Sequence, residues 1–160
     1  RVEMPLPSSL SRNPKYGKVF PSDLASMLIS VAYVVIGVPH LVYKLHYDRS
    51  LFHDFPLNKL GEESMKMIQA NVSIYSSQGK NSYRIRTYER GVNDETLACG
   101  SGCCAAACVE WDSEDETRGT LQKYTMHVAS GQNLGVDITE TGHFTLRGPA
   151  TKIYQGQASI

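Results

Sequence analysis

The residue types best suited to chemistry lie where a cysteine precedes a glycine-rich turn. Cys99 is followed by Gly100, Ser101 and Gly102, and then by an apolar run that ends at Val109. If that run is a helix, Cys99 lies at its N-terminus, where unpaired N–H groups and the macrodipole favour negative charge. We therefore expect a thiol pKa depressed below about 8.5, so that a thiolate forms near neutral pH.

The two glycines that flank Ser101 allow the backbone N–H groups of the turn to approach a ligand closely. A substrate carboxylate can then be held beside the sulfur of Cys99, and a carboxylate next to a Cα–H is half of a site for amino-acid racemisation. The structural alternative is that Cys99 is a buried packing residue and that the turn only caps the helix.

The other three cysteines, Cys103, Cys104 and Cys108, lie in the same short segment. Such clustering is unlike a disulfide framework and favours reduced thiols in a reducing compartment, with the cytoplasm as the default. A zinc site is a weaker alternative, because structural zinc sites pair a short knuckle with a distant second pair. The phosphate-binding pattern G-x-x-x-x-G-K-[ST] does not occur in the sequence.

The composition indicates one compact domain without a preference for polyanions. The 160 residues are 41% hydrophobic, and 16 basic residues balance 16 acidic ones. A net charge of zero argues against nucleic acid and anionic membranes as partners. The longest apolar stretch, residues 27–38, is shorter than the ~20 residues that a membrane-spanning helix needs.

These residues must be positioned by strands, most of them antiparallel. Alternating or β-branched segments separated by turns predict strands over residues 31–36, 41–45, 71–76, 82–88, 121–129, 134–138 and 143–147. Residues 1–21 are expected to be an extended first strand followed by an irregular loop, and residues 60–68 a short amphipathic helix.

The segment 102–109 has good helix formers but no polar face, so its helix must be enclosed on most sides. A strongly bent sheet around it satisfies that requirement. The fold class that we expect is therefore α+β, with a mainly antiparallel sheet wrapped around a central apolar helix.

Residues 88–107, YERGVNDETLACGSGCCAAA, closely resemble the second cysteine motif of the diaminopimelate epimerases. Further segments agree in order: residues 37–42 resemble the family's Gly-Asn-Pro-His segment, residues 71–72 its Asn-Val pair, and residues 148–150 with Gly156 its closing strand. The resemblance spans nearly all of the chain but only the C-terminal half of the family's usual length.

The resemblance implies an isomerase of lysine and peptidoglycan-precursor synthesis that interconverts LL- and meso-diaminopimelate without PLP or another cofactor. Two cysteines act from opposite faces of the substrate Cα, one as thiolate base and one as thiol acid. Cys99 matches the second of them, and His40 matches a histidine that works with Glu89 in setting thiol protonation.

The resemblance also assigns the substrate contacts. Glu89 and Arg90 match residues that grip the amino and distal carboxylate groups, and Asn71 matches a ligand of the distal end. The amide cradle for the reacting carboxylate corresponds to Gly100 and Ser101.

Each of these residues also has a structural interpretation: Arg90 as a surface charge, Asn71 as a turn residue, and His40 as a side chain bonded to a carbonyl. Val38 departs from the family, because many members carry a substrate-binding asparagine at this position.

The chain lacks a second thiol for the opposite face. Proton removal and return on opposite faces need two groups about 180° apart across the carbon. Cys103, Cys104 and Cys108 recede along the same helix by ~1.5 Å per residue and stay on one side of the substrate.

We therefore expect residues 1–160 to be a single domain, the C-terminal half of such an epimerase, inactive or nearly so without the N-terminal half. The partners implied are an amino-acid substrate, the missing N-terminal domain and, at a poorly covered edge over residues 154–160, a second copy of the chain. The alternatives are a non-catalytic amino-acid-binding module of the same fold and a related racemase or isomerase.

Overall fold

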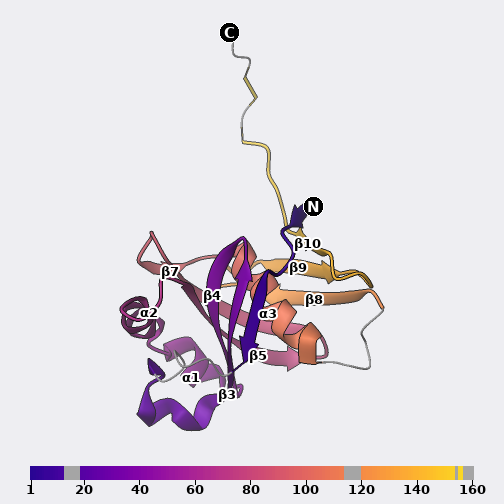
Figure 1. Cartoon of the computed structure of the whole chain (residues 1–160). Helices are drawn as coiled ribbons and strands as arrows, with labels where there is room; N and C mark the ends of the chain where they lie inside the picture. Colours follow the sequence, from indigo (N-terminus) through magenta and orange to yellow (C-terminus); the bar gives the residue numbers. More distant parts are fainter. Residues whose placement is uncertain (13–18, 114–119, 154, 157–160) are drawn as a thin grey trace.

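The computed structural model describes residues 1–12, 19–113, 120–153 and 155–156, in which ten strands form one curled sheet (Figure 1). The strands are β1 (Val2–Met4), β2 (Ser9–Arg12), β3 (Leu28–Ile36), β4 (Val38–Leu45), β5 (Asn71–Gly79), β6 (Ser82–Glu89), β7 (Asp94–Thr96), β8 (Gln122–His127), β9 (Asn133–Ile138) and β10 (Phe144–Arg147). The helices are the 3-10 helix η2 (Ser22–Met27), α1 (Arg49–Asp54), α2 (Leu57–Met65) and α3 (Gly100–Ser113).

The sheet is mixed rather than uniformly antiparallel. Its strand order is β1-β10-β9-β8-β6-β5-β4-β3-β2, and β7 pairs with β6. The pairs β4–β5 and β6–β8 are parallel, and the other pairs are antiparallel. Each parallel pair is joined by a helical connection, α1 and α2 in the first case and α3 in the second, because parallel strands cannot be joined by a tight turn.

Strands β1 and β2 are consecutive in the chain but lie at opposite edges of this sheet. In a flat sheet, eight gaps of about 4.8 Å would separate the two edges by roughly 38 Å. The connection of residues 5–8 can span no more than about 18 Å even when fully extended. The sheet must therefore curl until its two edges approach each other.

The core has two parts, one on each face of the central strands. On the concave side, Val42, Tyr75 and Ile85 pack with the buried residues of α3. On the other side, Leu41 and Val72 pack beneath α1 and α2, together with Phe52, Phe55 and Leu60. Burial on both faces accounts for the nearly continuous apolar runs in β3 and β4.

Helix α3 contacts β3, β4, β5, β8, β9 and β10. Every residue from Gly102 to Glu110 is buried. Glu110 is the charged residue of this set, and it accepts hydrogen bonds from Tyr75 Oη at 2.6 Å and Tyr83 Oη at 2.9 Å, while Lys44 Nζ lies 2.8 Å away. This buried carboxylate fastens the C-terminal turn of α3 to β4, β5 and β6.

The expected strands all occur, with ends that differ by a few residues, and the hairpin of β5 and β6 is among them. The expected helix over residues 60–68 is found as α2, three residues earlier. The elements that were not predicted are the second N-terminal strand β2, the 3-10 helix η2, the short strand β7 and the helix α1, whose N-cap Asp48 accepts from the backbone N–H groups of Ser50 and Leu51.

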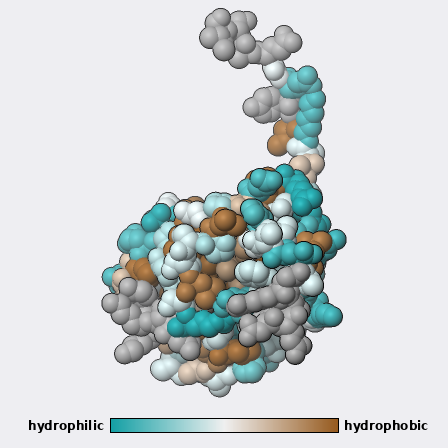
Figure 2. All heavy atoms as spheres, turned by 45° about the vertical axis from the view of Figure 1, so that its right-hand side comes forward, coloured by the Kyte–Doolittle hydropathy of each residue, from teal (hydrophilic) through white to brown (hydrophobic). Residues whose placement is uncertain are grey.

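The C-terminal segment does not join the sheet where the structure describes it. Residues 149–153 lead away from the body as extended chain, with Ile153 91% exposed (Figures 1 and 2). The edge expected over residues 154–160 falls mostly outside the described residues, because Gln155 and Gly156 are the described members of that range.

Replacing Glu110 by alanine should lower the free energy of unfolding by about 3–5 kcal/mol, because Lys44 and two tyrosine hydroxyls lose their buried partner. Urea denaturation followed by circular dichroism measures this change. Glu63→Ala is the control, since Glu63 pairs with Lys66 on the surface, and its loss should leave the free energy of unfolding nearly unchanged. Equal effects of the two substitutions would show that Glu110 does not fasten α3.

Candidate functional site

Three of the predicted site residues share one face of the sheet. Side chains alternate along a strand, so His40 lies on the same side as Val42, Asn71 on the same side as Tyr75, and Glu89 on the same side as Ile85. Those three apolar residues pack with α3. His40 and Asn71 are also cross-strand partners, so the site residues of β4, β5 and β6 face the helix that follows Cys99.

Cys99 immediately precedes α3, as expected. Its carbonyl accepts the first helical hydrogen bond from Cys103 N at 3.0 Å. Cys99 is 7% exposed, and its sulfur lies 3.5 Å from Ser101 Oγ and accepts a hydrogen bond from the N–H of Gly102. Cys99 thus occupies the boundary between the enclosed helix and the surface.

The expectation of a depressed pKa at Cys99 is wrong for this chain. Burial raises the pKa of the Cys99 thiol above its ordinary value, and the nearby Glu89 carboxylate adds to the rise. The hydrogen bonds from Ser101 and the Gly102 N–H act in the opposite direction but do not overcome desolvation. At neutral pH Cys99 is therefore a thiol.

The other three thiols lie deeper than Cys99. All four cysteines are free and buried. Burial raises the pKa of Cys104 and that of Cys108 to about 12, and it raises the pKa of Cys103 further still. These three thiols stay protonated over the whole physiological range.

His40 is fully buried, and neither ring nitrogen has a hydrogen-bond partner among the described residues. Burial lowers the pKa of His40 to about 4, so the ring is neutral at neutral pH. The structural alternative for His40, a hydrogen bond to a carbonyl, is thus not found in the described part of the chain. Glu89, which was predicted to act together with His40, instead accepts a hydrogen bond of 2.6 Å from Thr96 Oγ1.

Asn71 and Arg90 contact each other through the backbone. Asn71 Oδ1 accepts the N–H of Arg90 at 2.8 Å, which fixes the end of β6 against the start of β5. The Arg90 side chain is exposed, and its Nη1 donates to the carbonyl of Gln69 at 3.2 Å. Its guanidinium therefore keeps further donors directed at solvent.

Both glycines of the turn lie against other parts of the chain. A Cβ at Gly100 would lie 2.5 Å from Leu146 Cδ2, and one at Gly102 would lie 3.0 Å from Thr87 Oγ1 and 3.1 Å from Ser73 Oγ. Sequence reasoning missed Ser73 and Thr87. Strand alternation could have identified them, because side chains two residues apart lie on the same face of a strand. Ser73 follows Asn71 by two residues on β5, and Thr87 precedes Glu89 by two residues on β6.

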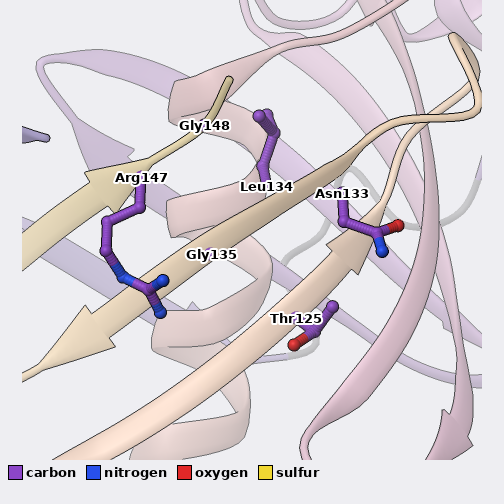
Figure 3. Close-up of a pocket in the computed structure, with 6 residues that line it drawn as sticks. All are labelled: Thr125, Asn133, Leu134, Gly135, Arg147 and Gly148. Atoms are coloured by element: carbon purple, nitrogen blue, oxygen red, sulfur yellow. The ribbon is translucent and has the colours of Figure 1, made fainter. Parts of the chain in front are cut away.

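Among the described residues, the crevice that Cys99 borders is too small for a ligand. This crevice, bounded by Thr87, Thr96, Cys99 and Ala129, does not admit even a water molecule. A larger hollow of about 380 Å³ lies elsewhere, on the outer face of β8, β9 and β10 (Figure 3). It is lined by Thr125, Asn133, Leu134, Gly135, Arg147 and Gly148, none of which was predicted as a site residue.

Two kinds of feature are absent from the described ranges. Within them, no group of three or more His, Cys, Asp or Glu side chains is arranged to hold a metal ion. No helix in that part of the chain is long and apolar enough to cross a membrane.

Known proteins resemble this chain in sequence over part of their length, although no model of a protein family matches it. Diaminopimelate epimerases from Vesicomyosocius okutanii subsp. Calyptogena okutanii and from Hydrogenobaculum sp. are each 33% identical to it, over 127 and 132 residues. Each alignment covers 79% of this chain but 45% and 46% of the relative, so the chain spans less than half the length of these relatives.

Solved structures share the fold at low identity. A phenazine biosynthesis protein of the PhzF family from Bacillus anthracis aligns with a TM-score of 0.60 at 8% identity, over 89% of this chain and 54% of that one. A PhzC/PhzF protein from Clostridium difficile aligns with a TM-score of 0.58 at 17% identity, over 98% and 55%. These likenesses show the fold alone, a strongly curled mixed sheet with few helices.

The raised pKa of Cys99 predicts slow alkylation at neutral pH. Because the thiolate is the reactive form, the rate of iodoacetamide addition at Cys99 should rise with pH and reach half its maximum above about 8.5, the value for a free cysteine. Mass spectrometry of the Cys99 peptide after timed alkylation measures this midpoint, with N-acetylcysteine as the reference. A midpoint below that of the reference would mean that the helix N-terminus outweighs burial.

Proposed function

We propose, from the premise that this chain is related in sequence to the diaminopimelate epimerases, that it supplies one of the two proton-transferring thiols of such an enzyme. The observation that carries the proposal is the position of Cys99. Its sulfur lies at the start of α3 between two hydrogen-bond donors, Ser101 Oγ and the Gly102 N–H, and beside the Glu89 carboxylate.

In the proposed reaction Cys99 works as an acid in one direction and as a base in the other. As an acid, its S–H bond breaks and a new C–H bond forms on one face of the substrate Cα, after another group has removed the proton from the opposite face. The electron pair of the broken C–H bond is held meanwhile by the α-carboxylate. Ser101 and the Gly102 N–H then stabilise the thiolate that remains.

The raised pKa fits the acid role, and the substrate itself can tune it. Glu89 contributes to the rise because its negative charge opposes a thiolate nearby. We propose that the substrate ammonium group pairs with Glu89, which would neutralise that charge and lower the pKa of Cys99 when substrate is bound. His40, neutral and buried behind the site, completes the catalytic set with Cys99 and Glu89.

The remaining proposed contacts hold the substrate. The backbone N–H groups of Gly100 and Ser101, in the first turn of α3, would take the reacting carboxylate. Arg90 would pair with the distal carboxylate through its free donors, and Asn71 would bind the distal end. This chemistry requires no PLP or other cofactor, and it requires reduced thiols, which a reducing compartment such as the cytoplasm maintains.

The chain is proposed to be the C-terminal domain, with half of the site. Cys103, Cys104 and Cys108 are at most 3% exposed and lie behind Cys99 along α3, so they cannot reach the opposite face of a substrate. The second thiol would come from an N-terminal domain, whose docking would also build the pocket that the crevice at Cys99 lacks. By itself the chain would be inactive.

Two alternatives have specific support. The first is a non-catalytic module that binds an amino acid, because the described thiols lie on one side of a bound substrate and leave its opposite face without a proton-transferring group. Val38 favours a related racemase or isomerase with another substrate, because it places a half-exposed apolar side chain on the same face as His40.

Isotope exchange tests the proposal. In heavy water, the chain mixed with the N-terminal half of a diaminopimelate epimerase should catalyse deuterium uptake at Cα of diaminopimelate, and neither half should do so alone. Cys99→Ala should reduce the rate at least about a hundredfold, since it removes a general acid–base group. The matched control, Cys108→Ala, should retain exchange.

Exchange that survives Cys99→Ala would refute the role of Cys99. Calorimetric binding of diaminopimelate without exchange, even after complementation, would instead identify a binding module. Exchange with a different amino acid and none with diaminopimelate would identify a related racemase.

A further inference from the structure

A row of hydroxyl side chains crosses three neighbouring strands beneath the first turn of α3. Ser73 on β5 is the cross-strand partner of Thr87 on β6, and Thr87 is the partner of Thr96 on β7. Ser73 and Thr87 are buried, and their oxygens are 2.9 Å apart. Thr96 Oγ1 donates to Glu89 Oε1. Thr96 belongs to the motif that precedes Cys99, whereas Ser73 and Thr87 lie outside it.

The backbone of Gly102 rests on the Ser73–Thr87 pair. A Cβ at Gly102 would lie 3.0 Å from Thr87 Oγ1, 3.1 Å from Ser73 Oγ and 3.4 Å from Cys99 Cβ. Both hydroxyls and the cysteine therefore fill the space that a side chain at Gly102 would occupy. Because the two oxygens share a hydrogen bond, they lie closer together than the roughly 3.5–4.0 Å that two methyl groups would need.

Gly102 links this pair to the sulfur. Its N–H is one of the two donors that favour the thiolate form of Cys99. The distance of that donor from the sulfur depends on how deeply the first turn of α3 sits on the sheet. The side chains that set this depth are the two that touch Gly102 from below, Ser73 and Thr87.

We propose that Ser73 and Thr87 are positioning residues for Cys99, and that their paired hydroxyls seat Gly102 at the depth where its N–H reaches the cysteine sulfur. The pair does not contact substrate. It acts through Gly102 on the stability of the thiolate. Its importance for proton transfer rests on the proposed function, but its effect on the thiol does not.

The test is the pH dependence of Cys99 alkylation in the 160-residue chain, with no substrate present. Thr87→Val replaces the oxygen by a methyl group that cannot share a hydrogen bond and needs more room. The midpoint should rise by about one pH unit, and the alkylation rate below the midpoint should fall about tenfold, as expected when a hydrogen bond to a charged group is lost. Thr87→Ser keeps the hydroxyl and should restore the wild-type midpoint.

Two serines of the same strand form a matched pair of variants. Ser73→Ala should shift the midpoint in the same direction as Thr87→Val, by a smaller amount. Ser76→Ala also removes a buried hydroxyl from β5, at a site remote from Gly102, and should leave the midpoint unchanged. Thermal unfolding of each variant verifies that the alkylated protein is folded.

An unchanged midpoint in folded Thr87→Val overturns the proposal, and so does an equal shift in Ser76→Ala. If Thr87→Val does not fold, an unchanged midpoint of Cys99 alkylation in folded Ser73→Ala overturns the proposal instead. Because the measurement uses the thiol alone, failure of isotope exchange would refute the proposed function and leave this result standing.

Discussion

The structure depends on one constraint, which is that α3 has no polar face from Gly102 to Val109. A helix built from alanine and cysteine, buried from Gly102 to Glu110, cannot remain in water and must be covered on most sides. The covering sheet achieves this by curling until its two edges are joined by one short connection between β1 and β2. Small residues along α3 let the strands approach its backbone closely.

The two ends of α3 differ in the side chains that hold them against the sheet. At the C-terminal end, Glu110 satisfies two tyrosine hydroxyls and a lysine, and Arg12 donates to the carbonyl of Val109, so that end is fastened to the sheet. At the N-terminal end, glycines and hydroxyls take the place of large side chains, and the first-turn N–H groups approach the surface. The fastened end holds the helix while the other end presents Cys99.

Much of the fold could be predicted from the sequence, because alternation and turn residues are local. The β5–β6 hairpin and the apolar helix are examples. Helix α1 was missed because it is a single short segment whose stability depends on the Asp48 cap and on packing of Phe52. The parallel pairings were missed because they join segments through helical crossovers, which no local pattern specifies.

The positions of the site residues could be predicted from the sequence, but the protonation states of Cys99 and His40 could not. Position relative to α3 indicated a stabilised thiolate at Cys99, yet burial outweighs the helix N-terminus and leaves a thiol. Burial also leaves His40 neutral and without a partner among the described residues. Both outcomes depend on how many groups surround a side chain in three dimensions, and the sequence does not show this.

The central claim is that the enclosed helix leaves one thiol, Cys99, at the boundary between core and surface. It is tested most directly by a pH titration of the four cysteine Cβ signals in an NMR spectrum of ¹³C-labelled protein. The account predicts that the Cys99 signal moves first, above the pH of a free thiol, while those of Cys103, Cys104 and Cys108 stay fixed up to about pH 11. Movement of a second cysteine signal together with that of Cys99, or no movement of the Cys99 signal, would contradict it.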